Sequence, residues 1–199
     1  MVQELIRYVL PPGFSAASTV DLPIVLFSVL LDEWSEGDPP DVTETHGVAI
    51  RAATAHDRSS WEEVFLSYRE SQIVGAPGVC QPADVAADGT WQVYFACPNR
   101  VLLMTDVSDG SVIGIAHFRH MPGIRSLQPW GFLGDIHIVP AKQGRGLGRL
   151  LFLELLRIAK KEELSTFRWK CLKNNEAALG FYHRLGFEPS SSKLVQYCG

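Results

Sequence analysis

The chain has 199 residues, of which 46% are hydrophobic and 20% are charged. This composition is typical of a globular protein and excludes a chain that is disordered throughout. The formal net charge of −4 argues against a protein that binds a long polyanion such as nucleic acid. The length favours one domain, or one domain with an extension.

The charges are unevenly distributed along the chain. Residues 1–141 carry seven Lys or Arg and seventeen Asp or Glu, whereas residues 142–173 carry nine Lys or Arg and three Glu. A basic island in an acidic chain predicts a local anionic ligand, although a solvated basic helix face would give the same pattern. The acidic first part would suit a cationic amine as a second ligand, but exposed acidic residues also serve solubility.

The sequence contains no pattern that is typical of secretion or of membrane insertion. The apolar run 22–31 is too short to span a bilayer, and acidic residues flank it. The four cysteines are widely spaced and include no CxxC pair, which favours free thiols in a reducing compartment. We therefore expect a cytoplasmic protein without a membrane partner.

The first 46 residues differ in pattern from the rest of the chain. The run 21–34 favours a helix that Asp21 could cap. A Gly- and Pro-containing segment at 36–40 then predicts a loop. We therefore predict an N-terminal extension over 1–46, whose role the sequence does not indicate, and a main domain over 47–199.

Hydrophobic periodicity predicts an α+β order of elements in the main domain. Antiparallel strands come first and a strand–helix–strand crossover follows, which predicts a mixed, mostly antiparallel central sheet flanked by helices. The predicted strands are 48–51, 91–96, 101–107, 112–121, 130–139 and 167–171, with short strands at Phe187 and 194–198. The predicted helices are 57–71, 146–162 and 175–185, with at most one short helix in the turn-rich stretch 75–90. The residues that share one face of the helix 57–71 are Trp61, Val64, Phe65 and Tyr68. Asn174 or Asn175 can cap the last helix, and Gly186 can end it.

A glycine-rich turn separates the strand 130–139 from the helix 146–162. In Gln143-Gly144-Arg145-Gly146-Leu147-Gly148 a glycine stands at every second position. Such a backbone can curl until its N–H groups face outward beside a helix N-terminus, which favours an anion such as pyrophosphate. A tight strand–helix turn without a ligand would show the same glycines. The spacing excludes a Walker loop and does not match the GxGxxG of a dinucleotide-binding fold.

Two motifs resemble those of the GNAT N-acetyltransferase superfamily. Residues 138–140 (Ile-Val-Pro) followed by Gln143–Gly148 resemble its acetyl-CoA signature, Gln/Arg-x-x-Gly-x-Gly/Ala. The segments 174–178 (Asn-Asn-Glu-Ala-Ala) and 181–187 (Phe-Tyr-His-Arg-Leu-Gly-Phe) resemble the next motif. The resemblance covers about residues 48–198 and implies a GNAT-like sheet splayed between the 130–138 and 167–171 strands. Within the superfamily, the spacing is most similar to that of the diamine acetyltransferase type.

The resemblance implies an acetyl-CoA-dependent N-acetyltransferase that acts on a primary amine by direct attack in a ternary complex. It implies that the strand 136–138 hydrogen-bonds the pantetheine and that the amides of 144–149 hold the pyrophosphate. The residues expected to bind acetyl-CoA are Ile136, His137, Ile138, Gln143, Gly144, Arg145, Gly146, Leu147, Gly148, Arg149, Asn175, Ala178 and Tyr182. A non-catalytic acyl-CoA-binding regulatory module is the alternative.

Acetyl transfer to an amine needs a base, an oxyanion donor and a proton for the leaving thiolate. The resemblance implies that Tyr182 supplies this proton. Relatives often carry a carboxylate base on the strand that becomes 130–138, but where the diamine type has Glu this chain has Gly134. Asp135 and His137 are the remaining candidates for the base. In a regular strand they point away from the face of Gly134 unless a bulge re-aims them, and either could be purely structural.

No metal site is expected. His117 and His120 are three positions apart on one predicted strand and therefore face opposite ways, which makes a metal pair improbable. An edge strand over 192–198 would offer a surface for a homodimer. The expected partners are thus acetyl-CoA, an amine and possible further copies of the chain, with neither nucleic acid nor membrane.

Overall fold

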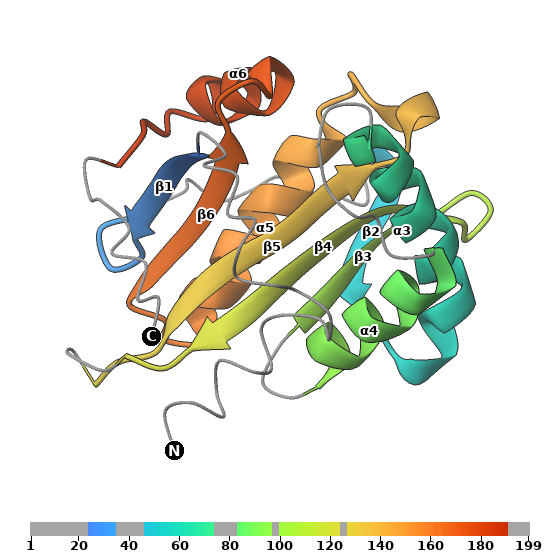
Figure 1. Ribbon diagram of the computed structural model, residues 1–199, viewed down its shortest axis with the longest axis horizontal. Helices are drawn as coiled ribbons and strands as arrows, with labels where there is room; N and C mark the ends of the chain where they lie inside the picture. Colours follow the sequence, from blue (N-terminus) through green and yellow to red (C-terminus); the bar gives the residue numbers. More distant parts are fainter. Residues whose placement is uncertain (1–23, 35–45, 74–82, 97–99, 124–126, 191–199) are drawn as a thin grey trace, which may run out of the picture. The chain divides into compact units, whose positions relative to one another are not determined.

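The computed structural model describes residues 24–34, 46–73, 83–96, 100–123 and 127–190. The chain divides into two compact units, one over Ser28–Trp169 and one made of Met1–Phe27 with Lys170–Gly199. Six strands form a sheet in the order β1-β6-β5-β4-β3-β2 (Figure 1). The strands are β1 Ile24–Leu30, β2 Val48–Ala52, β3 Arg100–Asp106, β4 Val112–Met121, β5 Trp130–Ile138 and β6 Thr166–Leu172. The helices are η2 Ala55–Asp57, α3 Arg58–Ile73, α4 Ala83–Phe95, η3 Pro140–Lys142, α5 Leu147–Lys161 and α6 Glu176–Arg184.

The sheet is mixed and mostly antiparallel, as predicted. β2, β3, β4 and β5 pair antiparallel in chain order, and β5 pairs parallel with β6. The parallel ladder comprises three residue pairs and ends at Leu133 and Trp169. Among the described residues, β4 is the only strand partner of the segment 134–138, which agrees with the predicted splay beside this strand.

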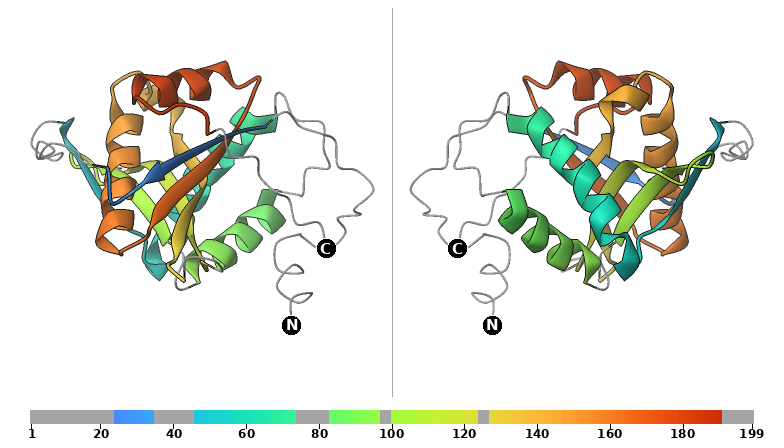
Figure 2. Two further views of the ribbon diagram at one scale, coloured as in Figure 1. Left: turned by 90° about the vertical axis from the view of Figure 1, so that its left-hand side faces the viewer. Right: turned by 90° about the vertical axis from the view of Figure 1, so that its right-hand side faces the viewer.

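Helices cover both faces of the sheet within the unit Ser28–Trp169. Figure 2 shows α3 and α4 on one face and α5 on the other. Successive side chains of β4 point to opposite faces of the sheet. His117 contacts Trp61 of α3 on one face, whereas Phe118 packs on Phe167 on the face that α5 covers. The core under α3 and α4 comprises Trp61, Val64, Phe65, Ala87, Tyr94, Val101, Leu103 and Ile115. The buried residues of α5 are Leu147, Leu151, Phe152, Leu155, Leu156 and Ala159.

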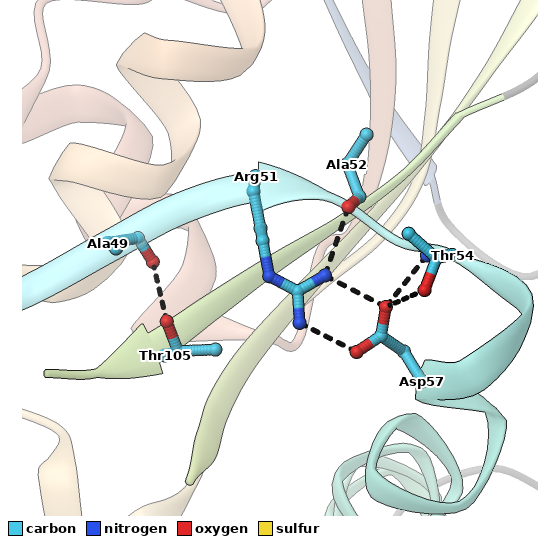
Figure 3. A network of polar contacts seen from close by, with 6 residues as sticks. All are labelled: Ala49, Arg51, Ala52, Thr54, Asp57 and Thr105. Carbon is cyan, nitrogen blue, oxygen red and sulfur yellow. Dashed lines mark hydrogen bonds and ion pairs between the residues drawn. The ribbon is translucent and has the colours of Figure 1, made fainter. Parts of the chain in front are cut away.

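An ion pair fixes the junction between β2 and α3. Arg51 binds both oxygens of Asp57, at 2.8 and 2.6 Å, and Asp57 also accepts from the Thr54 amide at 2.7 Å (Figure 3). The hydrogen bond from Arg51 is the main cause that lowers the pKa of the Asp57 carboxyl. This anchor holds the start of α3, the helix that carries the side chains facing β4 and β5.

Three predicted elements are wrong, one of which is the short strand expected at Phe187, a described residue that lies in no strand or helix. The run expected as a helix over 21–34 contains the strand β1, because a short apolar run rich in β-branched and aromatic residues fits either element. The strand expected at 91–96 is the end of α4, in which Ala87, Trp91 and Tyr94 follow helical spacing toward the core. The segment Trp-Gln-Val-Tyr-Phe is rich in aromatic and β-branched residues, which favoured a strand over the helical spacing. The predicted boundary at residue 46 stays a prediction.

No helix in the described part of the chain is long and apolar enough to cross a membrane. The edge strand expected at 192–198 lies outside the described residues, so the proposed dimer surface is not described either.

Candidate active site

The glycine-rich turn presents a row of unpaired main-chain donors. Gly144 and Gly146 have positive φ angles of 76° and 79°, in the left-handed region where a side chain is strained. Gly146 is the N-cap of α5. Among the described residues, no acceptor receives a hydrogen bond from the amides of 144–149. Because helix N-terminal amides carry partial positive charge, this row suits an anion.

Contacts on the strand side hold this turn in place. Gln143 donates from Nε2 to the carbonyl of Ile138 at 2.8 Å, and the Gln143 amide donates to the carbonyl of Pro140 at 3.2 Å. Lys142 forms an ion pair with Asp106 at 2.8 Å, and its hydrogen bond is the largest cause that lowers the pKa of that carboxyl. Arg145 and Arg149 are exposed. The positioning contacts therefore leave the row of amides and two cations accessible.

A β-bulge interrupts the pairing of β4 with β5. His117 pairs with Asp135 and Phe118 with Leu133, so Gly134 is the extra residue. A Cβ at Gly134 would overlap the hydroxyl of Tyr94 and lie 2.7 Å from its Cζ. Gly134 and Asp135 are therefore both directed at the helices α3 and α4, so the alternative of a bulge that re-aims them applies instead of regular-strand alternation. A Glu side chain at position 134 would meet the same overlap with Tyr94.

Five side chains around the bulge form a connected group, which we call the bulge cluster: Trp61, Tyr68, Tyr94, His117 and Asp135. Trp61 donates from Nε1 to His117 Nε2 at 2.7 Å, and His117 Nδ1 lies 3.0 Å from Asp135 Oδ2. Tyr68 donates its hydroxyl to Asp135 Oδ1 at 2.7 Å. The Tyr94 ring stacks on His117 with centroids 4.7 Å apart. Each polar atom of Asp135 thus has a defined donor.

The ionisation of the bulge cluster is set by burial and hydrogen bonding. Burial acts to raise the pKa of Asp135, but the hydrogen bond and electrostatic interaction with His117, the hydrogen bond from Tyr68 and the charge of Arg119 outweigh it, and the pKa is lowered. Burial raises the pKa of Tyr94 to about 12, so its hydroxyl stays protonated. Asp135 is therefore an anion and Tyr94 a hydrogen-bond donor at neutral pH.

His137 lies on the same face of β5 as Asp135. Only 7% of the residue is exposed, and its Nε2 lies 3.3 Å from the Ser67 hydroxyl of α3. Its ring centroid is 5.6 Å from that of Tyr68. Burial lowers the pKa of His137 below the ordinary 6.5, so the imidazole is neutral at neutral pH. A neutral imidazole has the free lone pair that a general base requires.

The other unit holds the remaining predicted site residues. Asn175 caps α6 and accepts a hydrogen bond from the Ala178 amide at 3.1 Å. Tyr182 is 5% exposed and its ring centroid lies 5.1 Å from that of Phe27. Burial, with a smaller contribution from Cys171, raises the pKa of the Tyr182 hydroxyl. Gly186 adopts a positive φ of 84° after the helix, as predicted.

The structure brings Asp135 and His137 together and adds residues that the sequence did not single out as functional. Trp61, Tyr68 and Tyr94 reach the same place from α3 and α4. The predicted opposition of His117 and His120 is confirmed, since His120 pairs with Glu162 at 2.7 Å on the other face.

The sequence model of the Acetyltransferase (GNAT) family matches residues 61–187. The chain belongs to this family. GNAT acetyltransferases use acetyl-CoA as their co-substrate, so the family supplies the anion that the row of amides suits.

Two curated relatives are mycothiol acetyltransferases. The protein from Kytococcus sedentarius is 30% identical over 173 residues, which are 83% of this chain and 52% of the relative. The protein from Rhodococcus erythropolis is 42% identical over 59 residues, which are 28% of this chain and 20% of the relative. The GNAT chain thus spans about half the length of the first relative and a smaller share of the second.

Solved structures show the same fold. A ribosomal-protein-alanine N-acetyltransferase from Brucella melitensis superposes with a TM-score of 0.59 at 17% identity, over 76% of this chain and 97% of that one. A possible acetyltransferase from Clostridium difficile gives 0.65 at 14% identity, over 75% and 96%. At this identity the likeness establishes the fold, and the recognition of a GNAT sheet from the sequence is confirmed.

Proposed function

We propose that this GNAT chain is an acetyl-CoA-dependent N-acetyltransferase that acetylates a primary amine by direct attack in a ternary complex. The observation that carries the proposal is the row of main-chain amides over 144–149, which have no acceptor among the described residues. A diphosphate is the anion of acetyl-CoA that this row can hold, and Arg145 and Arg149 add charge beside it.

Further predicted contacts complete the cofactor site. The strand segment 136–138 lies beyond the end of the β6 ladder, which supports its role in hydrogen-bonding the pantetheine. The carbonyl of Ile138 already accepts from Gln143, so Gln143 acts by shaping the turn. Asn175 and Ala178 at the start of α6 stay predicted contacts of the cofactor.

The general base of the proposed reaction is His137. The amine nitrogen attacks the thioester carbonyl carbon, the carbon–sulfur bond breaks, and a proton leaves the nitrogen. A neutral imidazole can take that proton directly or through one water. Asp135 is less suited, because both of its oxygens accept hydrogen bonds from neighbours that stabilise the anion. The two candidates for the base thus have different roles on chemical grounds.

The proposed proton donor to the thiolate is Tyr182. Its raised pKa keeps the hydroxyl protonated at neutral pH, which suits a hydrogen-bond donor to the leaving sulfur. Tyr182→Phe is expected to lower turnover while the affinity for acetyl-CoA stays near that of the wild-type protein. An unchanged turnover would remove Tyr182 from the mechanism.

A thiol-release screen tests the proposed function. The purified chain is given acetyl-CoA with polyamines, amino acids, amino sugars and peptide N-termini, and free thiol is measured. Release with one class of amine supports the proposal. Binding of acetyl-CoA without release across the panel would favour the regulatory module, and an absence of binding would reject both. Because two relatives are mycothiol acetyltransferases, the acceptor of those enzymes should be tested first.

A further inference from the structure

The bulge cluster contains a histidine whose tautomer is fixed by its neighbour. An indole N–H can only donate, so His117 Nε2, 2.7 Å from Trp61 Nε1, must accept. The ring proton of the neutral imidazole then resides on Nδ1, which donates to Asp135 Oδ2 at 3.0 Å. A second ring proton on Nε2 would face the indole N–H at this distance. The arrangement therefore fixes the Nδ1–H tautomer of His117 in a place where none of its side chain is exposed.

The groups that touch Asp135 leave its carboxylate without a permanently charged partner. Its two hydrogen-bond donors are the Nδ1–H of this His117 tautomer and the Tyr68 hydroxyl. The charged group on the neighbouring strand is Arg119, whose guanidinium lies over the Tyr94 ring, 4.8 Å from its centroid. Arg119 contributes at longer range and has no hydrogen bond to Asp135 among the described residues. An ionised carboxylate thus lies among hydrogen-bonding side chains and aromatic rings, with capacity for another donor.

Asp135 is also accessible. Its side chain is 20% exposed, whereas that of His117, directly behind it, is fully buried. It shares a strand face with His137, the proposed base, and the neighbouring residues Ser67 and Tyr68 of α3 contact these two side chains. An incoming group at the exposed side of Asp135 would therefore approach the imidazole as well.

We propose that Asp135 binds the acceptor as an ammonium ion. Trp61 and His117 are positioning residues that fix the orientation of the Asp135 carboxylate and favour its ionised form. The inference rests on the proposed function and names its acceptor class, which is a strongly basic aliphatic amine. Such amines are mostly protonated at neutral pH. The free-energy cost of desolvating the ammonium ion is smaller when it forms an ion pair with a carboxylate. Before the nitrogen attacks, the ammonium ion gives one proton to water, and His137 takes the second proton as the carbon–nitrogen bond forms.

A pair of amines of similar size separates charge from shape. Ethylamine is mostly an ammonium ion at neutral pH, whereas 2,2,2-trifluoroethylamine is mostly neutral. Binding of each to the full chain is measured by NMR titration of the histidine ring signals, so that the readout does not require turnover. We expect the wild-type protein to bind ethylamine about tenfold or more tightly than the fluorinated amine, as for a hydrogen bond between charged groups.

Asp135→Asn is the decisive variant, because the amide keeps the shape and can still accept from His117 and donate to Tyr68. We expect the preference for ethylamine to disappear while the affinity for acetyl-CoA is unchanged. Asp109→Asn is the matched control, since Asp109 lies in the turn between β3 and β4, and it should retain the preference. A preference that survives in Asp135→Asn would overturn the inference.

Trp61→Phe tests the positioning role separately. Loss of the indole donor should change the nitrogen-15 signature of the His117 ring from that of a fixed Nδ1–H tautomer and should weaken the preference for ethylamine. An unchanged signature would overturn the role of Trp61.

Failure of the proposed function can be distinguished from failure of this inference. If the wild-type protein binds ethylamine through Asp135 but releases no thiol with any amine, the ammonium site is supported and the enzymatic function is rejected.

Discussion

In the proposed enzyme, the glycine-rich turn and the bulge cluster would recognise their ligands by opposite means. The turn is a contiguous stretch, and it offers main-chain N–H groups that lack acceptors among the described residues. The bulge cluster is drawn from α3, α4, β4 and β5, and it offers a side-chain carboxylate that accepts hydrogen bonds from His117 and Tyr68. The first arrangement suits an anion and the second a cation, which are the two charges that acetyl-CoA and an amine bring.

The comparison also teaches how each site depends on its sequence. Main-chain donors survive most side-chain changes, provided that the backbone keeps its left-handed turns at Gly144 and Gly146. The bulge cluster has no such redundancy, because the two ring nitrogens of His117 and the two oxygens of Asp135 contact specific side chains. Replacements near the bulge should therefore have larger effects than replacements of charged residues around the turn.

The largest effect is expected for His137→Ala, which removes the proposed base. Turnover should fall by about 100-fold or more, the usual contribution of general base catalysis, while acetyl-CoA affinity is retained. The measurement is steady-state thiol release together with cofactor binding at equilibrium. His56→Ala, an exposed residue of η2, is the control and should leave both unchanged.

The pH profile gives the same test without a mutation. Burial lowers the pKa of His137 from 6.5, so the neutral base persists below that pH. The rate should rise with pH through the lowered pKa of His137. Above pH 6.5, the ionisation of His137 should cause no further change in the rate. Loss of this acidic limb in His137→Ala would support the assignment, and an identical limb in both proteins would assign it to another group.

The contrast between the two sites explains how much the sequence could predict. The turn, the Asn175 cap and Gly186 depend on residues close in the chain, and the structure has each of these local features as predicted. The shared face of Trp61 and Tyr68 was also predicted from helical spacing. Their hydrogen bonds were not, because their partners His117 and Asp135 lie 56 and 67 residues away in the chain.

The remaining errors have equally specific causes. β1 and α4 were assigned the wrong type because short apolar runs fit a strand or a buried helix, and only tertiary partners decide between them. The bulge at Gly134 has no local sequence signal beyond the glycine itself. The Tyr94 hydroxyl, which leaves no room for a Cβ at Gly134, belongs to a helix that the sequence pattern had predicted as a strand.

Gly134→Glu tests this packing and should destabilise the protein by about 1–3 kcal/mol, the usual cost of forcing atoms into a filled core. The overlap with Tyr94 is the cause, so Tyr94→Ala in the same chain should recover part of the loss. Chemical denaturation of the single and double variants measures the coupling. Gly89→Glu on α4 is the control, since a Cβ there meets nothing within 4 Å. Additive effects of Gly134→Glu and Tyr94→Ala would contradict the proposed overlap.

The smallest effect is expected for Arg145→Ala at the glycine-rich turn. Arg145 is exposed, and an exposed charge beside a phosphate contributes about 0.2–1 kcal/mol, so acetyl-CoA affinity should fall only a few-fold. Added salt should shrink the difference, because mobile ions screen exposed charges. Lys161→Ala, in the last turn of α5, removes the same charge at the other end of the helix and should leave the affinity unchanged. A large, salt-resistant loss in Arg145→Ala would mean that side-chain charge holds the diphosphate, and the contrast with the bulge cluster would then fail, because both sites would depend on single side chains.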